Sequence, residues 1–293
     1  MSEAPTSTQP DKKDDLGLTP EEIEENKKAQ QELEAHNEAV TKQMEDLKNA
    51  VRKDMPFVSK YLTLDEYKLK WEGNKFYDSF DSIMTKFSKV RELRRDGNCF
   101  YRAILWQIFE YFLVNKSEHA LVEYDKILKK IEGAKQDLMD NGYDEVVVDM
   151  FHDQFLEEFK GLSEPKIDVT DDEAVEKYLE ERLCDESLAS YLITYIRFII
   201  SAYLKANREM YQPFIELDMD TYCQIRVDAV EQEAEEICII GLMNYLDLAV
   251  EIIQVQPDGL AYTSKIPEDA VDDESRFIGR LLFTPGHYDS LHI

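Results

Sequence analysis

The residues best suited to chemistry lie around Cys99, in the stretch RRDGNCFYRAILW at 94–106. Asp96 and Gly97 predict a turn, and Asn98 joins it to an apolar segment that starts at the cysteine. Free N–H groups and the dipole at a helix start favour an anion, and the thiolate is the nucleophilic form of cysteine. The same N–H groups could bind the oxygen of a tetrahedral intermediate. The pattern therefore allows a nucleophile, although a buried core cysteine is the commoner explanation for such a residue.

A thiol nucleophile needs a base and a group that orients the base. The final segment supplies both types, because His287 opens it and Asp289 follows two residues later. Residues i and i+2 of a strand point to the same side, so the imidazole and the carboxylate should lie together. A turn histidine and a solvated acid are the commoner explanations for each residue alone. Combined with Cys99 at a helix start, the pair is much more selective for a thiol hydrolase.

Composition limits the partners and cofactors. The chain has 293 residues, 43% of them hydrophobic, with 34 basic and 62 acidic residues and a formal charge of −28. Such a surface repels nucleic acid and suits either solubility or a basic protein partner. The four cysteines form no C-x-x-C pair, so we expect no metal, no cofactor and no disulfide framework; they are Cys99, Cys184, Cys223 and Cys238.

The location of the protein is predicted from its N-terminus and its hydropathy. The opening MSEAPTSTQPDKKDD has no apolar core, so it does not predict a signal peptide. No run approaches the ~18 apolar residues of a membrane span. We expect a reduced, soluble monomer in the cytoplasm or also in the nucleus, without membrane contact.

Two regions are predicted: an N-terminal arm at 1–55 and a compact domain at 56–293. Residues 1–18 are polar and read as disordered, and a helix is predicted over 19–54, with Thr19 as its N-cap. This helix has only a narrow apolar stripe, so it is either a solvated extension or an arm that becomes ordered on a partner.

The compact domain is predicted to be mostly helical, with a small sheet at its C-terminal end. The strands expected at 248–255, 276–284 and 287–293 lie close in sequence and favour a mainly antiparallel sheet. Helices are expected over 59–71, 74–90, 99–114, 117–140, 147–162, within the acidic stretch 163–187, over 187–211 and over 235–247.

Two motifs carry a family resemblance. DGNCFYRA at 96–103, together with PGHYD at 285–289, resembles the ovarian-tumour (OTU) family of deubiquitinating cysteine proteases, and most closely its long-armed otubain branch. The resemblance extends over nearly all of 56–293. It implies an α+β, papain-like OTU cysteine protease fold, with the small sheet packed between helical lobes.

The resemblance also implies an activity, a deubiquitinase that hydrolyses isopeptide bonds in lysine-48-linked polyubiquitin through a thioester. The alternative is a regulatory module that binds ubiquitin and E2 ubiquitin-conjugating enzymes with little turnover. The implied catalytic residues are the nucleophile Cys99, the base His287, its orienting acid Asp289, the turn acid Asp96, and the oxyanion backbones of Gly97 and Asn98.

Two binding surfaces follow from the same resemblance. Long-armed otubains are also non-catalytic inhibitors of E2 enzymes, which gives the polar N-terminal helix a role in holding ubiquitin. The implied ubiquitin-binding residues are Met210, Phe214, Ile215, Arg226, Val227, Ile240, Met243, Thr263 and Lys265. The implied E2-binding residues are Tyr143, Val146, Met150, Tyr191 and Tyr195.

The sequence departs from the otubain pattern in two places. Arg95 stands before Asp96 where related otubains often have proline, so we expect a looser entry to the turn. The acidic stretch at 163–187 has no match in the pattern.

Overall fold

The computed structural model of the chain describes residues 55–268 and 277–293, and within the N-terminal segment residues 23–24, 26–28, 39–40, 42–43 and 46. The chain divides into two units, residues 1–51 and 52–293. The described residues of the first unit are helical. The cap predicted at Thr19 and most of the helix predicted over 19–54 lie outside the described residues.

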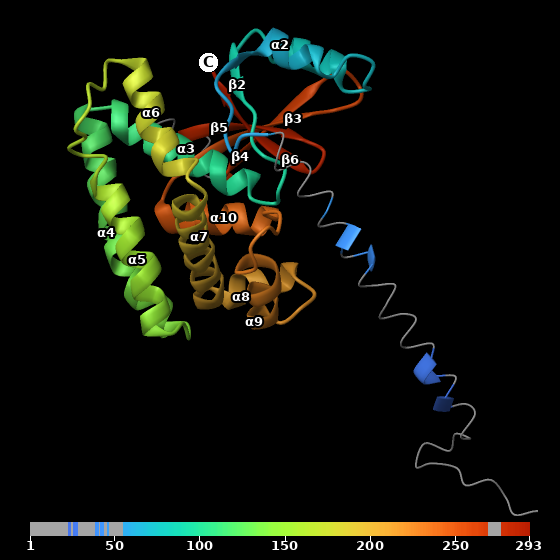
Figure 1. Ribbon diagram of the computed structural model, residues 1–293, viewed down its shortest axis with the longest axis vertical. Helices are drawn as coiled ribbons and strands as arrows, with labels where there is room; N and C mark the ends of the chain where they lie inside the picture. Colours follow the sequence, from blue (N-terminus) through green and yellow to red (C-terminus); the bar gives the residue numbers. More distant parts are fainter. Residues whose placement is uncertain are drawn as a thin grey trace, which may run out of the picture. The chain divides into compact units, whose positions relative to one another are not determined.

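One six-stranded sheet organises the second unit (Figure 1). Neighbouring strands are antiparallel except for β3 and β5, which are parallel. The prediction of a mainly antiparallel sheet in an α+β fold is therefore confirmed. In spatial order the strands are β1 (Leu62–Thr63), β2 (Lys89–Arg91), β6 (His287–His292), β5 (Phe277–Thr284), β3 (Ala249–Val255) and β4 (Ala261–Ile266).

Half of these strands were not predicted. β1 and β2 contain two and three residues, which is too short for an alternating pattern to be recognised. β4 is largely exposed and mixes polar with apolar residues, so its sequence reads as a loop. β5 and β6 agree with prediction because β-branched and aromatic residues flank a short turn, in which Gly286 adopts a φ of +71°.

Helix α3 (Cys99–Val114) is the central helix of the core, and its bounds agree with the prediction. It packs on β5 and β6, and 13 of its 16 residues are buried. Burying each large apolar side chain stabilises the fold by about 1.5–3 kcal/mol. The position of Cys99 is therefore fixed by the whole helix that it begins.

The remaining helices lie together on the side of the sheet where α3 lies and form a helical lobe (Figure 1). Several begin with an acidic N-cap whose side chain accepts a backbone N–H, as at Asp144, Asp171 and Asp185. The elements are α4 (Glu118–Asp140), α5 (Glu145–Lys160), α6 (Asp172–Leu183), α7 (Glu186–Ala206), α8 (Arg208–Tyr211), η2 (Gln212–Phe214), α9 (Met219–Tyr222), η3 (Cys223–Val227) and α10 (Glu236–Leu246).

The opposite face of the sheet carries a smaller apolar cluster, packed under α2 (Leu64–Leu69) and the 3-10 segment η1 (Tyr77–Ser82). A capping box between Thr63 and Glu66 starts α2 inside the segment predicted to be helical over 59–71. The helix predicted over 74–90 is wrong: the segment forms η1, turns and β2. The aromatic residues of this segment pack into the cluster, and this packing, rather than helical periodicity, determines the conformation of its backbone.

Helix α7 corrects one expectation from hydropathy. By length and composition it is the one helix among the described residues that could cross a membrane. Much of it is buried against the other helices of the lobe, as expected of a core helix of this composition.

Candidate active site

The turn before Cys99 is built on the Asp96 carboxylate. Its Oδ1 accepts the N–H of Asn98 at 3.0 Å, and its Oδ2 accepts Nη2 of Arg102 at 2.6 Å. Asp96 and Arg102 are both buried, so this ion pair is shielded from solvent. Asp96, predicted to belong to the active site, therefore acts here by shaping the turn.

Gly97 gives that turn a left-handed backbone and lets another segment approach it closely. Its φ is +79°, and a Cβ added there would lie 2.0 Å from the carbonyl oxygen of Glu231. Glu231 itself has a left-handed φ of 63°. The segment that follows η3 therefore lies directly against the catalytic turn, at a distance that only a glycine permits.

A buried arginine that sequence reasoning missed joins these two segments. Arg197 of α7 donates to Oδ1 of Asn98 at 2.7 Å and to the carbonyls of Gln232 at 2.7 Å and Val227 at 3.0 Å. It also donates to the carbonyl of Gly97 at 3.4 Å. The Asn98 side chain is thus used by Arg197 and does not cap α3.

The predicted imidazole–carboxylate pair is present. Nε2 of His287 lies 2.8 Å from Oδ1 of Asp289, and both residues are about 1% exposed. Nδ1 of His287 has no other conventional hydrogen-bond partner among the described residues, which leaves it available to Cys99. Strand parity therefore predicted this contact correctly.

The surroundings of His287 favour the protonated form of its imidazole. Burial opposes the charge, but the hydrogen bonds and charges of Asp289 and Cys99 outweigh it and raise the pKa of His287 to about 9. An imidazolium beside a cysteine favours the thiolate form. His287 is therefore placed to serve as the proton carrier beside Cys99.

The other described histidines near the core do not compete for this role. Burial and the charges of nearby basic residues lower the pKa of His292 to about 3, and its ring contacts Tyr61. Nδ1 of His152 lies 2.7 Å from the hydroxyl of Tyr195, within the helical lobe.

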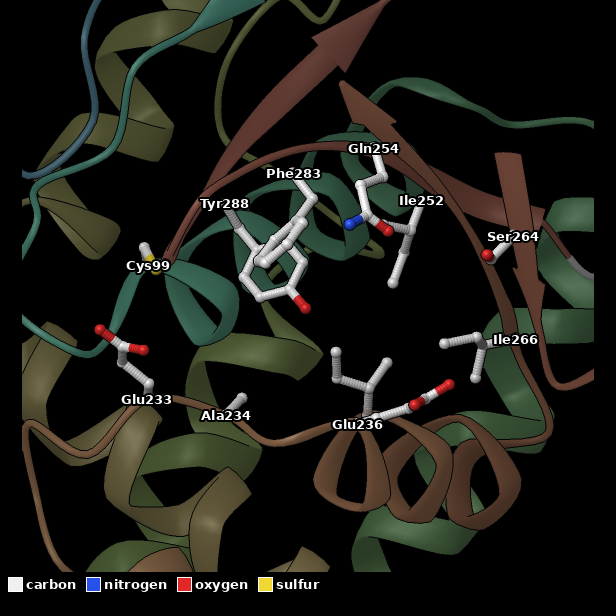
Figure 2. A pocket seen from close by; sticks show the side chains of 12 residues that line it. Cys99, Glu233, Ala234, Glu236, Ile252, Gln254, Ser264, Ile266, Phe283 and Tyr288 are labelled. Carbon is white, nitrogen blue, oxygen red and sulfur yellow. The ribbon is translucent and has the colours of Figure 1, made fainter. Parts of the chain in front are cut away.

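A cavity of about 350 Å³ leads to Cys99, whose residue surface is only 4% exposed. Figure 2 shows Cys99 at one edge, Tyr288 and Phe283 beside it, and Ser264 and Ile266 on the opposite side. The lining is largely apolar, with an acidic element at Glu233 and Glu236. Burial, followed by the charges of Cys99 and these two glutamates, raises the pKa of the Tyr288 phenol. The shape and lining suit an extended peptide that reaches the thiol.

The predicted oxyanion donors are only partly available. The Asn98 N–H is bonded to Asp96, so it is not free to bind an oxyanion in this conformation, and that part of the prediction is corrected. Arg197 binds the carbonyl oxygen of Gly97, which is an acceptor, so the oxyanion role of the Gly97 backbone N–H stays a prediction. Helix geometry leaves the N–H of Cys99 itself without an intrahelical acceptor, which makes it the donor best placed for the role.

Three residues predicted to bind partners are core residues. Val227, Met243 and Tyr195 are fully buried, so their side chains cannot form a docking surface, and these predictions are wrong. Each lies on the inward face of its segment. Exposed members of the ubiquitin set are Met210, Phe214, Arg226 and Thr263, with Ile215, Ile240 and Lys265 half-buried. In the E2 set, Val146 and Met150 are exposed, and Tyr143 and Tyr191 are half-buried.

The fold and the site define a class of enzyme, a cysteine hydrolase in which a thiol at a helix start faces a histidine on the last strand. Residues 48–292 match the otubain family, peptidase C65, and the chain belongs to that family. It is a cysteine-type deubiquitinase of the OTU fold.

Several relatives support this assignment. The chain is 28% identical over 264 residues to human ubiquitin thioesterase OTUB1, covering 88% of this chain and 91% of the relative. It is 28% identical over 223 residues to the ubiquitin thioesterase otubain-like protein of Caenorhabditis elegans, covering 74% and 73%. A solved structure described as "The structure of h/ceOTUB1-ubiquitin aldehyde-UBC13~Ub" superposes with a TM-score of 0.76 at 25% identity, covering 88% of this chain and 98% of that chain.

Proposed function

We propose that the protein hydrolyses isopeptide bonds in lysine-48-linked polyubiquitin by a Cys99–His287–Asp289 thiol mechanism. The observation that carries the mechanism is the buried pair of His287 and Asp289, with the free Nδ1 of the imidazole left for Cys99 at the end of a cavity. The linkage preference is supported by the otubain resemblance of the motifs at 96–103 and 285–289.

In the first half of the reaction, the Cys99 thiolate attacks the carbonyl carbon of ubiquitin's C-terminal glycine. The N–H of Cys99 binds the resulting oxyanion. The imidazolium of His287 gives its proton to the leaving lysine amine, the C–N bond breaks, and a thioester remains on Cys99.

In the second half, neutral His287 takes a proton from water, and the hydroxide attacks the thioester carbonyl. The C–S bond breaks, ubiquitin leaves with a free carboxylate, and the thiolate–imidazolium pair is restored. In both halves Asp289 orients the ring and stabilises the imidazolium.

The test is a panel of diubiquitins of each linkage, incubated with wild-type protein and with Cys99→Ala. We expect wild-type protein to cleave the lysine-48-linked dimer most rapidly and the variant to cleave none, with an unchanged unfolding midpoint. Failure of well-folded wild-type protein to cleave any linkage would refute the catalytic proposal.

We propose a second, non-catalytic activity, the restraint of E2 ubiquitin-conjugating enzymes. The descriptions of two similar structures name OTUB1 with ubiquitin aldehyde and with UBC13~Ub or UBCH5B~Ub. In this chain, Val146 is 77% and Met150 49% exposed on α5, and Tyr191 of α7 lies against Met150. Exposed apolar side chains gathered in this way are typical of a docking surface.

This second activity separates from catalysis in a chain-synthesis assay. Cys99→Ala should still inhibit ubiquitin-chain formation by an E2, whereas Val146→Glu or deletion of residues 1–50 should relieve inhibition. Leu121→Glu, at another exposed apolar residue of the helical lobe, is the matched control and should inhibit normally. Equal inhibition by all variants would exclude both the α5 surface and the arm.

The alternative is a purely regulatory module that binds ubiquitin and E2 enzymes with little turnover. It predicts inhibition by wild-type protein but no cleavage in the diubiquitin panel, even with an E2 present. The monomeric state and the cytoplasmic location remain predictions from the sequence.

A further inference from the structure

The second oxygen of the Asp289 carboxylate has a partner outside the predicted catalytic set. The hydroxyl of Tyr67 donates to Oδ2 at 2.6 Å, across 222 residues of sequence. We propose that Tyr67 is a positioning residue for catalysis, which fixes Asp289 and acts through it on His287. This inference rests on the thiol mechanism proposed above.

Three donors surround Asp289 and account for its orientation. Oδ1 faces Nε2 of His287 at 2.8 Å and accepts the backbone N–H of Leu93 at 2.8 Å, while Oδ2 accepts the Tyr67 hydroxyl. Without the Tyr67 bond, Oδ2 would be left as a buried charged oxygen, which is costly. Rotation of the carboxylate toward another donor would then lower its free energy, and Oδ1 would no longer be oriented toward Nε2 of His287.

Tyr67 is itself fixed by a rigid local structure. The capping box at Thr63 and Glu66 starts α2, and the Tyr67 ring packs at 5.6 Å from Phe80 and 6.3 Å from Trp71. Burial, together with the charge of Asp289, raises the pKa of Tyr67 well above its ordinary value, so the phenol remains a donor. The smaller apolar cluster thus holds the Tyr67 hydroxyl within hydrogen-bond distance of Asp289.

A second buried tyrosine provides a matched comparison. The hydroxyl of Tyr124 donates to the carbonyl of Phe159 at 3.1 Å, a neutral bond within the helical lobe. Hydrogen bonds to ionised acceptors are shorter and stronger than neutral ones. Loss of the hydroxyl at Tyr67 should therefore affect the protonation chemistry of the site, whereas loss at Tyr124 should affect stability alone.

The test compares Tyr67→Phe, Asp289→Asn, the double variant and Tyr124→Phe. The first readout is kcat and KM for a ubiquitin conjugate. The second needs no ubiquitin: the rate at which iodoacetamide alkylates Cys99 as a function of pH, followed by mass spectrometry of the peptide that contains Cys99. Unfolding midpoints check that each variant is folded.

We expect Tyr67→Phe to lower kcat about 10-fold with KM nearly unchanged, an effect in the range of one weakened orienting contact. Its alkylation profile should move toward that of Asp289→Asn, and Tyr67→Phe should add nothing in the Asp289→Asn background. Tyr124→Phe should leave both readouts unchanged.

The contrary results are separable from failure of the proposed function. A Tyr67→Phe profile that matches Tyr124→Phe, or effects that add in the double variant, would overturn the positioning role. Absence of ubiquitin cleavage by wild-type protein, together with the expected shift in alkylation, would refute the proposed function while supporting the role of Tyr67.

Discussion

The two halves of the active site are held in place in different ways. His287 and Asp289 lie on a strand, and the carboxylate is fixed by the N–H of Leu93 and the hydroxyl of Tyr67. The turn before Cys99 is held instead by two buried arginines. Arg102 pairs with the acid of the turn. Arg197 binds the Asn98 side chain and the Gly97 carbonyl, together with two carbonyls of the segment at 227–232.

This difference separates two kinds of defect. Changes around Asp289 should alter how the site holds a proton, and therefore its pH profile. Changes around the turn should alter where the thiol and the oxyanion donor lie, with the pH profile preserved.

The largest loss of activity is expected from changes at Asp289, in the half of the site that contains His287. Asp289→Asn should lower kcat/KM about 10²–10⁴-fold, because the imidazolium loses its stabilising charge and its orientation. The pKa of His287, raised to about 9, sets the alkaline limb of the wild-type profile, and the variant's limb should move to lower pH as burial then dominates. A pH–rate profile from pH 5 to 10 measures both, and an unmoved limb would contradict the assignment.

The same group makes stability depend on pH. The folded pKa of His287 lies above its ordinary value of 6.5, so its contribution to stability is fully present below about pH 6.5. That contribution is lost as pH rises through about 9. Asp289→Asn should flatten this part of the curve of unfolding free energy against pH.

The next effect is expected on the turn. Gly97→Ala should lower kcat about 10²-fold and destabilise the protein by about 1–3 kcal/mol, because the new Cβ meets the Glu231 carbonyl. Gly73→Ala is the matched control, since its φ is also positive, +77°, but nothing lies within 4 Å of the added Cβ. If the two variants have equal kcat, the close approach at Gly97 has no catalytic importance.

A smaller effect is expected at Arg197. Lysine keeps the charge but loses the planar fork that reaches several acceptors, so Arg197→Lys should lower kcat about 10-fold. Each buried acceptor left without a donor costs about 1–3 kcal/mol of stability. The alkaline limb should stay where it is in wild-type protein, and Arg208→Lys, at an exposed ion pair, should behave as wild type. A shifted limb would mean that the two halves are not separate.

The smallest effect is expected outside both halves. Phe214 is 80% exposed within the candidate ubiquitin surface, so Phe214→Ala should raise KM up to about 10-fold without changing kcat or the unfolding midpoint. Leu69→Ala, at an exposed leucine of α2, is the control. Equal KM values for the two variants would place ubiquitin elsewhere.

The sequence predicted the features that depend on local pattern. Cys99 begins α3 as expected, since a turn motif and a continuous apolar run mark that boundary. The contact between His287 and Asp289 follows from strand parity alone. Both predictions depend only on residues that are close together in the sequence.

The sequence could not predict features made by distant segments. Tyr67 and Arg197 reach the site from 222 and about 100 residues away, and no local motif marks either one. Val227, Met243 and Tyr195 were placed on surfaces because a family resemblance locates a segment but not the face that a side chain occupies. Their burial depends on packing within the helical lobe.

The central claim is that Cys99, alone among the four cysteines, attacks the C-terminal carbonyl of ubiquitin. Incubation with ubiquitin that carries a C-terminal vinyl sulfone, which captures an attacking thiolate as a stable thioether, followed by mass spectrometry of the intact protein and its peptides, tests it directly. We predict one ubiquitin added per chain, located on Cys99 and absent from Cys99→Ala. An adduct on Cys184, Cys223 or Cys238, or no adduct on folded wild-type protein, would contradict the account.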